Sequence, residues 1–326
     1  MTKRLLIFLL LLLVWVPGRA QFFRRLDNWL KARQEKQPSD TTYIYRPQEK
    51  WLVRTRSLFW GESLSLVTGG VDTGNLGSGF IVGSGLGFKQ TIGGGYRNLT
   101  LDLGYAPFGK KTAADFSLRI YGNRFGLTVG SSMTFGYAGG ATAQGQTFTV
   151  QSGDIVGIYG QISAYYAVNG RRFSFPAAMN QSYRQLHSAG SLFVLASARA
   201  LPVIVLDEEL RDMHMESAIC ALAGAGLGYG YNWVPSEHWL VHACLNETVG
   251  IWNSTVMSFQ DYERDFKRNT PIFVTTGSFA VLYYYRKWYF GLYADFDSLL
   301  FAGEDNVAMM MGRMKSSTNL TIGVRF

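Results

Sequence analysis

Apolar and polar residues alternate one by one in many short stretches of this chain. In "NLTLDLGY", Leu101 and Leu103 have one parity, and Thr100 and Asp102 have the other. Because successive side chains of a strand point to opposite faces, each stretch predicts a strand with one apolar and one polar face. Such strands can build a soluble β-sandwich or the wall of a membrane barrel, and alternation alone does not choose between them.

The ending "STNLTIGVRF" adds a second indication. Its apolar face ends in an aromatic residue, a pattern that resembles the last strand of bacterial outer-membrane barrels. Four residues form this candidate assembly signal: Leu320, Ile322, Val324 and Phe326. We expect the barrel-assembly machinery of the outer membrane to recognise them.

The composition favours the barrel over the sandwich. Charged residues make up 17% of the chain, below the usual quarter, while aromatic residues make up 15% and glycines number 37. No run of 18 apolar residues follows the first 20 positions, so a membrane would have to be crossed by strands of a closed barrel. The basic residues are scattered, which does not indicate a nucleic-acid-binding protein.

The first 20 residues have the features of a cleaved secretory signal peptide. Lys3 and Arg4 precede an apolar run over residues 5–16, and cleavage is expected after Ala20. The run is shorter than the roughly 20 residues that a spanning helix needs, although an uncleaved anchor is the alternative. Together with the strands, this predicts the outer membrane of a Gram-negative bacterium, with outer-membrane lipid as a partner.

The pattern predicts an all-β, antiparallel, up-and-down transmembrane barrel of about 12 strands. The expected strands are 61–70, 78–89, 94–105, 113–121, 124–135, 153–168, 185–200, 217–231, 238–252, 271–285, 287–298 and 316–326.

The lengths of the connections separate the two folds. Short connections near 90–93, 121–124, 232–237 and 286–287 alternate with longer ones, as periplasmic turns alternate with outer loops in membrane barrels. The sixth connection, "NGRRFSFPAAMNQSYR" at 169–184, should be a short turn and is not.

Aromatic residues gather at two of the short connections. They are Tyr229, Tyr231, Trp233 and Trp239 at one connection, and Tyr283, Tyr285, Trp288 and Tyr289 at the other. Core packing would explain any single residue, but their recurrence at one rim favours a girdle at the lipid headgroups.

Residues 21–58 precede the expected barrel, which is assigned to 59–326. Phe22, Leu26, Trp29 and Leu30 fall at helical spacing among basic residues. A basic amphipathic helix can lie on an anionic membrane surface, or it can fold onto the mouth or into the lumen of the barrel. The segment is therefore expected to be helical and periplasmic, or to act as a plug.

Two stretches carry a resemblance to a known family. "DTTYIYRPQEKWLVRTRS" and "FPAAMNQSYRQLHSAGS", with a length near 330, resemble the domain of unknown function 4421 (DUF4421) family of exported bacterial proteins. The resemblance covers most of the mature chain. It implies the outer membrane and no defined activity, so no catalytic residue is carried over.

The polar faces of the expected strands provide the candidate site. Five charged residues have lumen parity and are expected to line the interior with ion pairs: Asp102, Arg119, Asp295, Asp297 and Arg325. No metal site, cofactor or catalytic residue is assigned. His238 and His242 share a strand face, but lie roughly 13 Å apart at about 3.3 Å per residue, too far to bind one ion together. A disulfide between Cys220 and Cys244 is left open.

Three classes of function fit this chain. We favour a narrow channel or transporter for a small or apolar solute. The alternatives are a barrel enzyme that acts on lipids, with an enzyme the less favoured class, and a structural or adhesive barrel that uses its long loops. The sequence does not identify the solute.

Overall fold

The computed structural model describes residues 19–36, 38–70, 79–106, 112–143, 146–208, 215–259, 263–267, 272–304 and 307–326. The chain forms two units, residues 1–38 and residues 39–326. Most of the expected signal peptide, residues 1–18, lies outside the described residues.

The first unit contains one helix, α2 (Arg19–Glu35). A cation–π contact places the Arg33 guanidinium 5.4 Å from the Trp29 ring, and Lys31 and Glu35 lie one helical turn apart with 3.9 Å between their charged atoms. The helical spacing seen in the sequence is thus confirmed. Within the described residues, no helix is long and apolar enough to cross a membrane.

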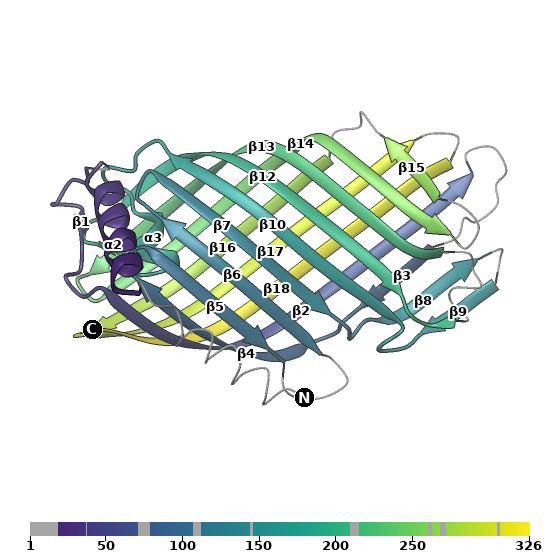
Figure 1. The fold of residues 1–326 in the computed structure, drawn as a ribbon, viewed down its shortest axis with the longest axis horizontal. Coiled ribbons are helices and arrows are strands. Elements are labelled where there is room, and N and C mark those ends of the chain that lie inside the picture. Colours follow the sequence, from purple (N-terminus) through teal and green to yellow (C-terminus); the bar gives the residue numbers. More distant parts are fainter. Residues whose placement is uncertain are drawn as a thin grey trace. The chain divides into compact units, whose positions relative to one another are not determined.

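The second unit is a closed antiparallel barrel of 12 strands, as predicted (Figure 1). In order around the wall the strands are β2 (Trp51–Gly70), β4 (Gly87–Tyr96), β5 (Leu99–Tyr105), β6 (Ala113–Tyr121), β7 (Phe125–Thr134), β10 (Ile155–Ala167), β12 (Ala189–Val205), β13 (Met215–Ser236), β14 (Trp239–Phe259), β16 (Ile272–Tyr285), β17 (Trp288–Glu304) and β18 (Val307–Arg325). The barrel closes where β18 pairs with β2, from Val307 opposite Gly70 to Arg325 opposite Leu52.

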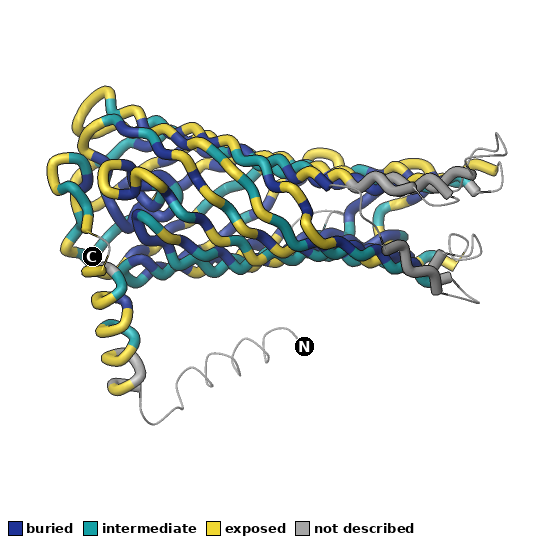
Figure 2. The backbone as a smooth tube through the Cα atoms, turned by 90° about the horizontal axis from the view of Figure 1, so that it is seen from above, coloured by how far each residue is buried: buried dark blue, intermediate teal, exposed yellow. Residues whose placement is uncertain are grey.

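Exposed and buried positions alternate along the strands (Figure 2). On β5, Leu101 and Leu103 are exposed, whereas Thr100 and Asp102 are buried inside. Exposed apolar side chains recur around the wall: Ile162, Leu192, Leu227, Leu245 and Leu320 are each more than half exposed. A closed barrel with an apolar outer face is the form that a lipid bilayer requires.

The wall differs from the expected strands at its start. β2 begins at Trp51, ten residues earlier than predicted, and the second connection lies at Arg97–Asn98 instead of 90–93. Gly93 therefore lies within β4, where a Cβ atom would come within 2.0 Å of the Asp102 carboxylate. This glycine marks a close approach of side chains inside the lumen, which sequence reasoning mistook for a turn.

Four tight connections lie at one end of the barrel, which we call the turn end, and a fifth, at residues 305–306 between β17 and β18, lies at the opposite end. The four at the turn end are Arg97–Asn98, Gly122–Arg124, Glu237–His238 and Arg286–Lys287, and Arg97 and Arg286 both adopt a φ of 54°. Trp51 and Phe326 are also at this end, where each donates a backbone hydrogen bond to the other. The expected aromatic rim is present in part, since Tyr229, Trp233 and Trp239 are exposed, but Tyr289 points into the lumen and is buried.

The opposite end, which we call the loop end, carries the additional strands β3 (Gly79–Gly83), β8 (Ala138–Ala143), β9 (Gln146–Val150) and β15 (Glu263–Lys267) (Figure 1). β3 continues β4 beyond a break at residues 84–86, and pairs with β2 on one side and β8 on the other. The long connections are thus partly built of strands.

The unusually long sixth connection folds inward at the turn end. It contains the short helix α3 (Phe175–Met179) and the strand β11 (Arg184–Gln185), which pairs with β1 (Ile44–Tyr45). Phe173, Ala177 and Asn180 of this connection are completely buried. We call residues 169–188 the plug, because they fill the lumen where a short turn would have left it open.

Candidate functional site

The plug is held in shape by its own polar groups. Ser174 caps α3 by accepting a hydrogen bond from the Ala177 amide at 3.3 Å, and Pro176 lies in the first turn, where no backbone N–H is needed. Gln181 adopts a φ of 54° and donates from Nε2 to the Ala178 carbonyl at 2.8 Å. Burial of the Tyr183 side chain raises the pKa of its phenol above the usual value.

Side chains on several strands bind the plug. Arg54 of β2 donates to the Gln181 side chain at 3.3 Å, and Gln181 donates to the Tyr293 hydroxyl of β17 at 2.7 Å. Asn232 of β13 donates to the Ser174 carbonyl at 2.9 Å. The plug therefore contacts distant parts of the wall through polar groups that would each lose a partner if it left.

Aromatic rings surround α3 on one side. Phe175 packs with ring centroids 5.0 Å from Tyr165, 5.6 Å from Tyr121 and 5.3 Å from Phe193, mostly edge to face. His242 joins them, since its ring lies 5.6 Å from Phe175 and its Nδ1 lies 2.7 Å from the Asn232 side-chain oxygen. His242 thus supports the plug.

The segment before β2 covers the plug. Asp40 pairs with Arg172 at 3.4 Å, and the Leu186 amide donates to the Tyr43 carbonyl at 2.7 Å. The backbone N–H of Thr42, which donates to the Asp40 carboxylate, lowers the pKa of that carboxyl.

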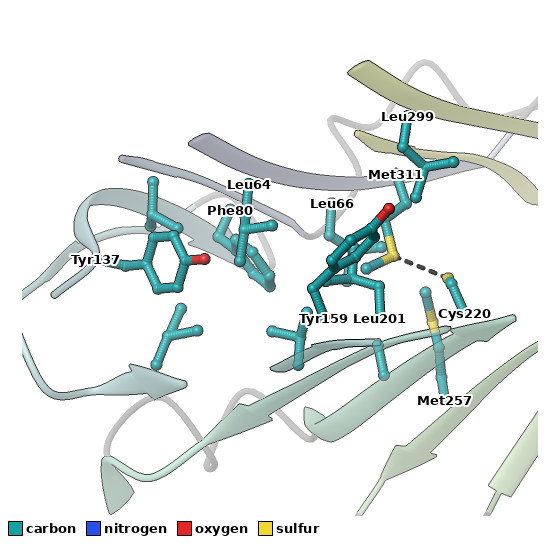
Figure 3. Close-up of a cluster of buried hydrophobic side chains, with 14 of the residues drawn as sticks. Leu64, Leu66, Phe80, Tyr137, Tyr159, Leu201, Cys220, Met257, Leu299 and Met311 are labelled. Carbon is teal, nitrogen blue, oxygen red and sulfur yellow. Dashed lines mark hydrogen bonds between the residues drawn. The ribbon is translucent and has the colours of Figure 1, made fainter. Parts of the chain in front are cut away.

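Toward the loop end, the lumen is filled by apolar side chains that project from opposite walls (Figure 3). This apolar cluster includes Leu64, Leu66, Phe80, Tyr137, Tyr159, Leu201, Cys220, Met257, Leu299 and Met311, all nearly completely buried. A barrel lumen is usually polar, so an apolar filling near its loop end is a second closure of the interior.

Ion pairs occupy the lumen between the plug and the apolar cluster. Asp102 lies at the centre of the first group: Arg54 binds it through Nε at 2.8 Å and through Nη2 at 2.6 Å, and Arg119 binds it at 2.7 Å. Arg56 lies farther away, with Nη2 3.7 Å from the same carboxylate. One carboxylate therefore faces three guanidinium groups, and Arg54 connects this group to the plug.

The second group lies nearer the apolar cluster. Arg313 binds Glu62 at 2.7 Å and Asp297 at 2.8 Å, and Asp297 also binds Arg199 at 2.5 Å. The Arg313 guanidinium lies 3.8 Å from the ring centroid of Tyr159, a member of the apolar cluster. Lys89 forms a further ion pair with Asp115.

Two cavities of about 240 and 270 Å³ lie among these ion pairs. Met179 of the plug lines both, and Tyr159 lines the larger one. We call the two cavities and the charged side chains around them the chamber. It is bounded by the plug on one side and by the apolar cluster on the other.

The five candidate lining residues are placed as follows. Asp102 and Arg119 form one ion pair, and Asp297 belongs to the other group. Asp295 lines both cavities. Arg325 lies apart, at the turn end, where it reaches the Glu49 carbonyl at 3.5 Å.

Sequence reasoning missed several side chains of the chamber. Arg54 and Arg56 fall within the segment predicted to precede the barrel, although their parity in "WLVRTRS" matches a wall strand. Arg313 lies before the predicted start of the last strand at 316, whereas β18 starts at Val307. In both stretches, the alternation of inward and outward positions continues for one further repeat beyond the predicted strand.

Other residues that the sequence marked lie as follows. Cys220 and Cys244 are both free and buried. Leu320, Ile322 and Phe326 of the candidate assembly signal are exposed on the outer face, and Val324 is half-buried. Within the described residues, no group of three or more His, Cys, Asp or Glu residues could hold a metal ion.

Comparisons with known proteins give distant matches in structure. No curated protein matches the sequence. The toluene transporter TodX of P. putida is 10% identical, with 86% of this chain and 91% of that chain covered and a TM-score of 0.32. The outer membrane protease OmpT of Escherichia coli is 7% identical over 86% and 98%, with a TM-score of 0.36. The translocator domain of NalP from Neisseria meningitidis is 12% identical over 95% and 97%, with a TM-score of 0.33.

These structures include a transporter, a protease and a translocator, so likeness at this level indicates no activity. The family comparison covers most of the chain. The model of "Domain of unknown function (DUF4421)" matches residues 38–326, which include the barrel, the plug and the segment that covers it. The chain belongs to the DUF4421 family.

Proposed function

We propose that this protein is an outer-membrane transporter, closed at both ends in the conformation described, that passes a small solute when the plug and the apolar cluster both open. One observation carries the proposal: the lumen keeps two cavities among charged side chains, between two separate closures. A barrel with a purely structural role needs no internal cavity lined by ion pairs, because buried charges stabilise a fold little compared with apolar packing.

The orientation follows from the general architecture of such barrels. Short turns face the periplasm and longer loops face the exterior, so the turn end with its plug would be periplasmic. The signal peptide at residues 1–20 would deliver the chain for export, and the barrel-assembly machinery would insert it. The segment at 21–58 would lie in the periplasm, with its final residues forming the first part of β2.

A second candidate, a lipid-acting barrel enzyme, has less support. His187 packs against Tyr43, and Ser188 accepts a hydrogen bond from the Val234 amide at 2.9 Å, so both serve the plug. The other well-placed histidine, His242, is bound to Asn232 beneath the aromatic rings. Neither histidine is placed as a general base for a serine.

A reversible lock on the plug tests the transporter proposal. Tyr45 of β1 is paired directly opposite Arg184 of β11, so cysteines at both positions are placed to form a disulfide that ties the plug to the segment leading into β2. The probe is potassium chloride current through the purified protein in planar bilayers. We expect brief openings of the unmodified barrel, loss of openings in oxidised Tyr45→Cys/Arg184→Cys, and their return after reduction.

The single variant Arg184→Cys is the matched control, because it changes the same strand pair without forming the disulfide. If the oxidised double variant conducts like the control, plug movement does not gate the lumen. If no form conducts under any condition, the barrel is structural and the transporter proposal is wrong.

A further inference from the structure

The chamber has an excess of positive charge. Within the described residues, six basic side chains line the two cavities: Arg56, Lys89, Arg119, Arg199, Arg313 and Lys315. Four carboxylates line them: Asp102, Asp115, Asp295 and Asp297. Buried Arg54 and Glu62, which bind members of these sets, add one charge of each sign and leave the excess unchanged. Charges held away from water are stable when paired, so the excess favours an anion in the cavity.

Arg56 has binding capacity that its contacts with the protein leave unused. Arg54 and Arg119 already occupy the Asp102 carboxylate at 2.6–2.8 Å, which leaves Arg56 at 3.7 Å. No described protein atom accepts a hydrogen bond from its buried Nε. A guanidinium offers two parallel N–H groups to an oxyanion, so Arg56 is equipped to bind a carboxylate or phosphate group.

The surroundings of Arg56 match such a ligand. Asn319 and Lys315 line the same cavity, and the Asn319 side-chain oxygen already accepts a hydrogen bond from Thr321 at 2.9 Å, which leaves its amide N–H groups as donors. The cavity of about 270 Å³ is close to the smallest sites that hold organic ligands, roughly 300 Å³.

The apolar cluster begins at the other side of this cavity. Tyr159 lines the cavity, packs within the cluster and contacts Arg313. A ligand with its charged group at Arg56 could therefore place an apolar part toward Tyr159 and the side chains beyond it. Neither a bare ion nor a neutral hydrocarbon would use both surfaces.

We infer that the chamber binds a small organic anion, in which an oxyanion group is carried on a short apolar chain, with Arg56 as the residue that binds the charged group. This inference rests on the proposed transport function and names the class of solute that the barrel would pass.

Direct binding tests the inference. The folded full-length protein in a non-ionic detergent is titrated calorimetrically with octanoate, octanol and inorganic phosphate. We expect octanoate to bind at least tenfold more tightly than octanol or phosphate. Arg56→Gln should weaken octanoate binding at least tenfold, and Arg56→Lys should recover part of it. Arg286→Gln, which removes a guanidinium from a tight turn outside the chamber, should bind like the unchanged protein.

The folded state of each variant is checked by its heat-modifiable mobility on a gel. Equal binding of octanoate and octanol, or full octanoate binding by folded Arg56→Gln, would overturn the anion site. Phosphate binding as tight as octanoate binding would overturn the apolar half of the inference. The titration measures occupancy of the chamber and the bilayer measures ion flow, so binding can fail while gated currents persist, and currents can fail while binding persists.

Discussion

The two ends of the lumen are closed in different ways. At the turn end one continuous segment, residues 169–188, occupies the lumen and is held by hydrogen bonds from residues such as Arg54 and Asn232. At the loop end the closure consists of side chains that belong to the wall itself, such as Leu64 of β2 and Leu201 of β12. A separate segment can leave as one body, whereas a closure made by the wall opens only if its side chains or strands move apart.

The difference also concerns the forces involved. A buried polar group that loses its partner costs about 1–3 kcal/mol of stability. Departure of the plug would break several such pairs at once. Apolar side chains contribute about 1.5–3 kcal/mol each when fully buried, and they separate without leaving unsatisfied groups. The turn end is therefore suited to an all-or-none change, and the loop end to a gradual one.

The largest expected effect comes from opening both closures. If they act in series, replacing residues 173–183 with a Gly-Ser linker leaves the lumen closed by the apolar cluster, and Phe80→Ser with Leu201→Ser leaves it closed by the plug. The combined variant should conduct potassium chloride at least tenfold better than either parent in planar bilayers. A linker variant that already conducts as well as the combined one would show that the apolar cluster is no barrier.

The next effect concerns the anchor of the plug. Asp102 holds three guanidinium groups, and its replacement by Asn leaves buried Arg54 without a charged partner. We expect Asp102→Asn to lower the free energy of unfolding by about 3–5 kcal/mol, measured by urea titration in lipid vesicles. Asp154→Asn is the control, because Asp154 lies outside the barrel strands and caps a local turn. A similar loss of unfolding free energy in Asp154→Asn would mean that the barrel does not depend specifically on the ion pair between Asp102 and Arg54.

A somewhat smaller loss of stability is expected for the apolar closure. Leu201→Ala removes a side chain that is 1% exposed within the cluster, and should cost about 2–5 kcal/mol. Leu245→Ala changes a residue that is 57% exposed on the outer face, where lipid replaces the lost contacts, and should cost much less. Equal losses in the same urea titration would indicate that the cluster is loosely packed or hydrated.

The smallest effect on stability is expected at the rim. Phe326 is 57% exposed, so Phe326→Asp, which keeps the backbone hydrogen bonds with Trp51, should change the stability of the refolded barrel by about 1 kcal/mol or less. If Phe326 is part of an assembly signal, the same substitution should strongly lower the amount of folded, membrane-inserted protein in cells. Quantitative blotting of the heat-modifiable form measures this yield. Normal yield in cells would remove the basis for the assembly signal.

The fold was accessible from the sequence because alternation is a local property. Many wall strands show their two faces within a short stretch of sequence, as in Leu101 beside Asp102. The interior was less accessible, because its contacts join residues far apart in the chain. The bond between Arg313 and Glu62 spans 251 positions, and no local pattern specifies it.

The plug shows the same limit. The length of 169–184 was recognisably wrong for a turn, but the sequence did not show that Ser174 would meet Asn123, or that Gln181 would lie between Arg54 and Tyr293. The short helix Phe175–Met179 is also too brief for a periodic signal. The unusual length of this connection indicated where in the chain a special feature lies, but not which contacts it makes.

The backbone pairing of Trp51 with Phe326 has a consequence for the order of events during folding. β2 and its closing partner β18 lie at opposite ends of the barrel sequence, so one edge of β2 stays unpaired until the rest of the wall has formed. Bringing ends about 270 residues apart together costs on the order of 5 kcal/mol of chain entropy from its length dependence alone. The backbone hydrogen bonds between β18 and β2 offset this cost. They run the full length of β18, so they form late and as one step. Until then the wall is an open sheet with two unpaired edges. Unpaired edges promote aggregation, so a longer time in this state favours aggregation over closure of the barrel.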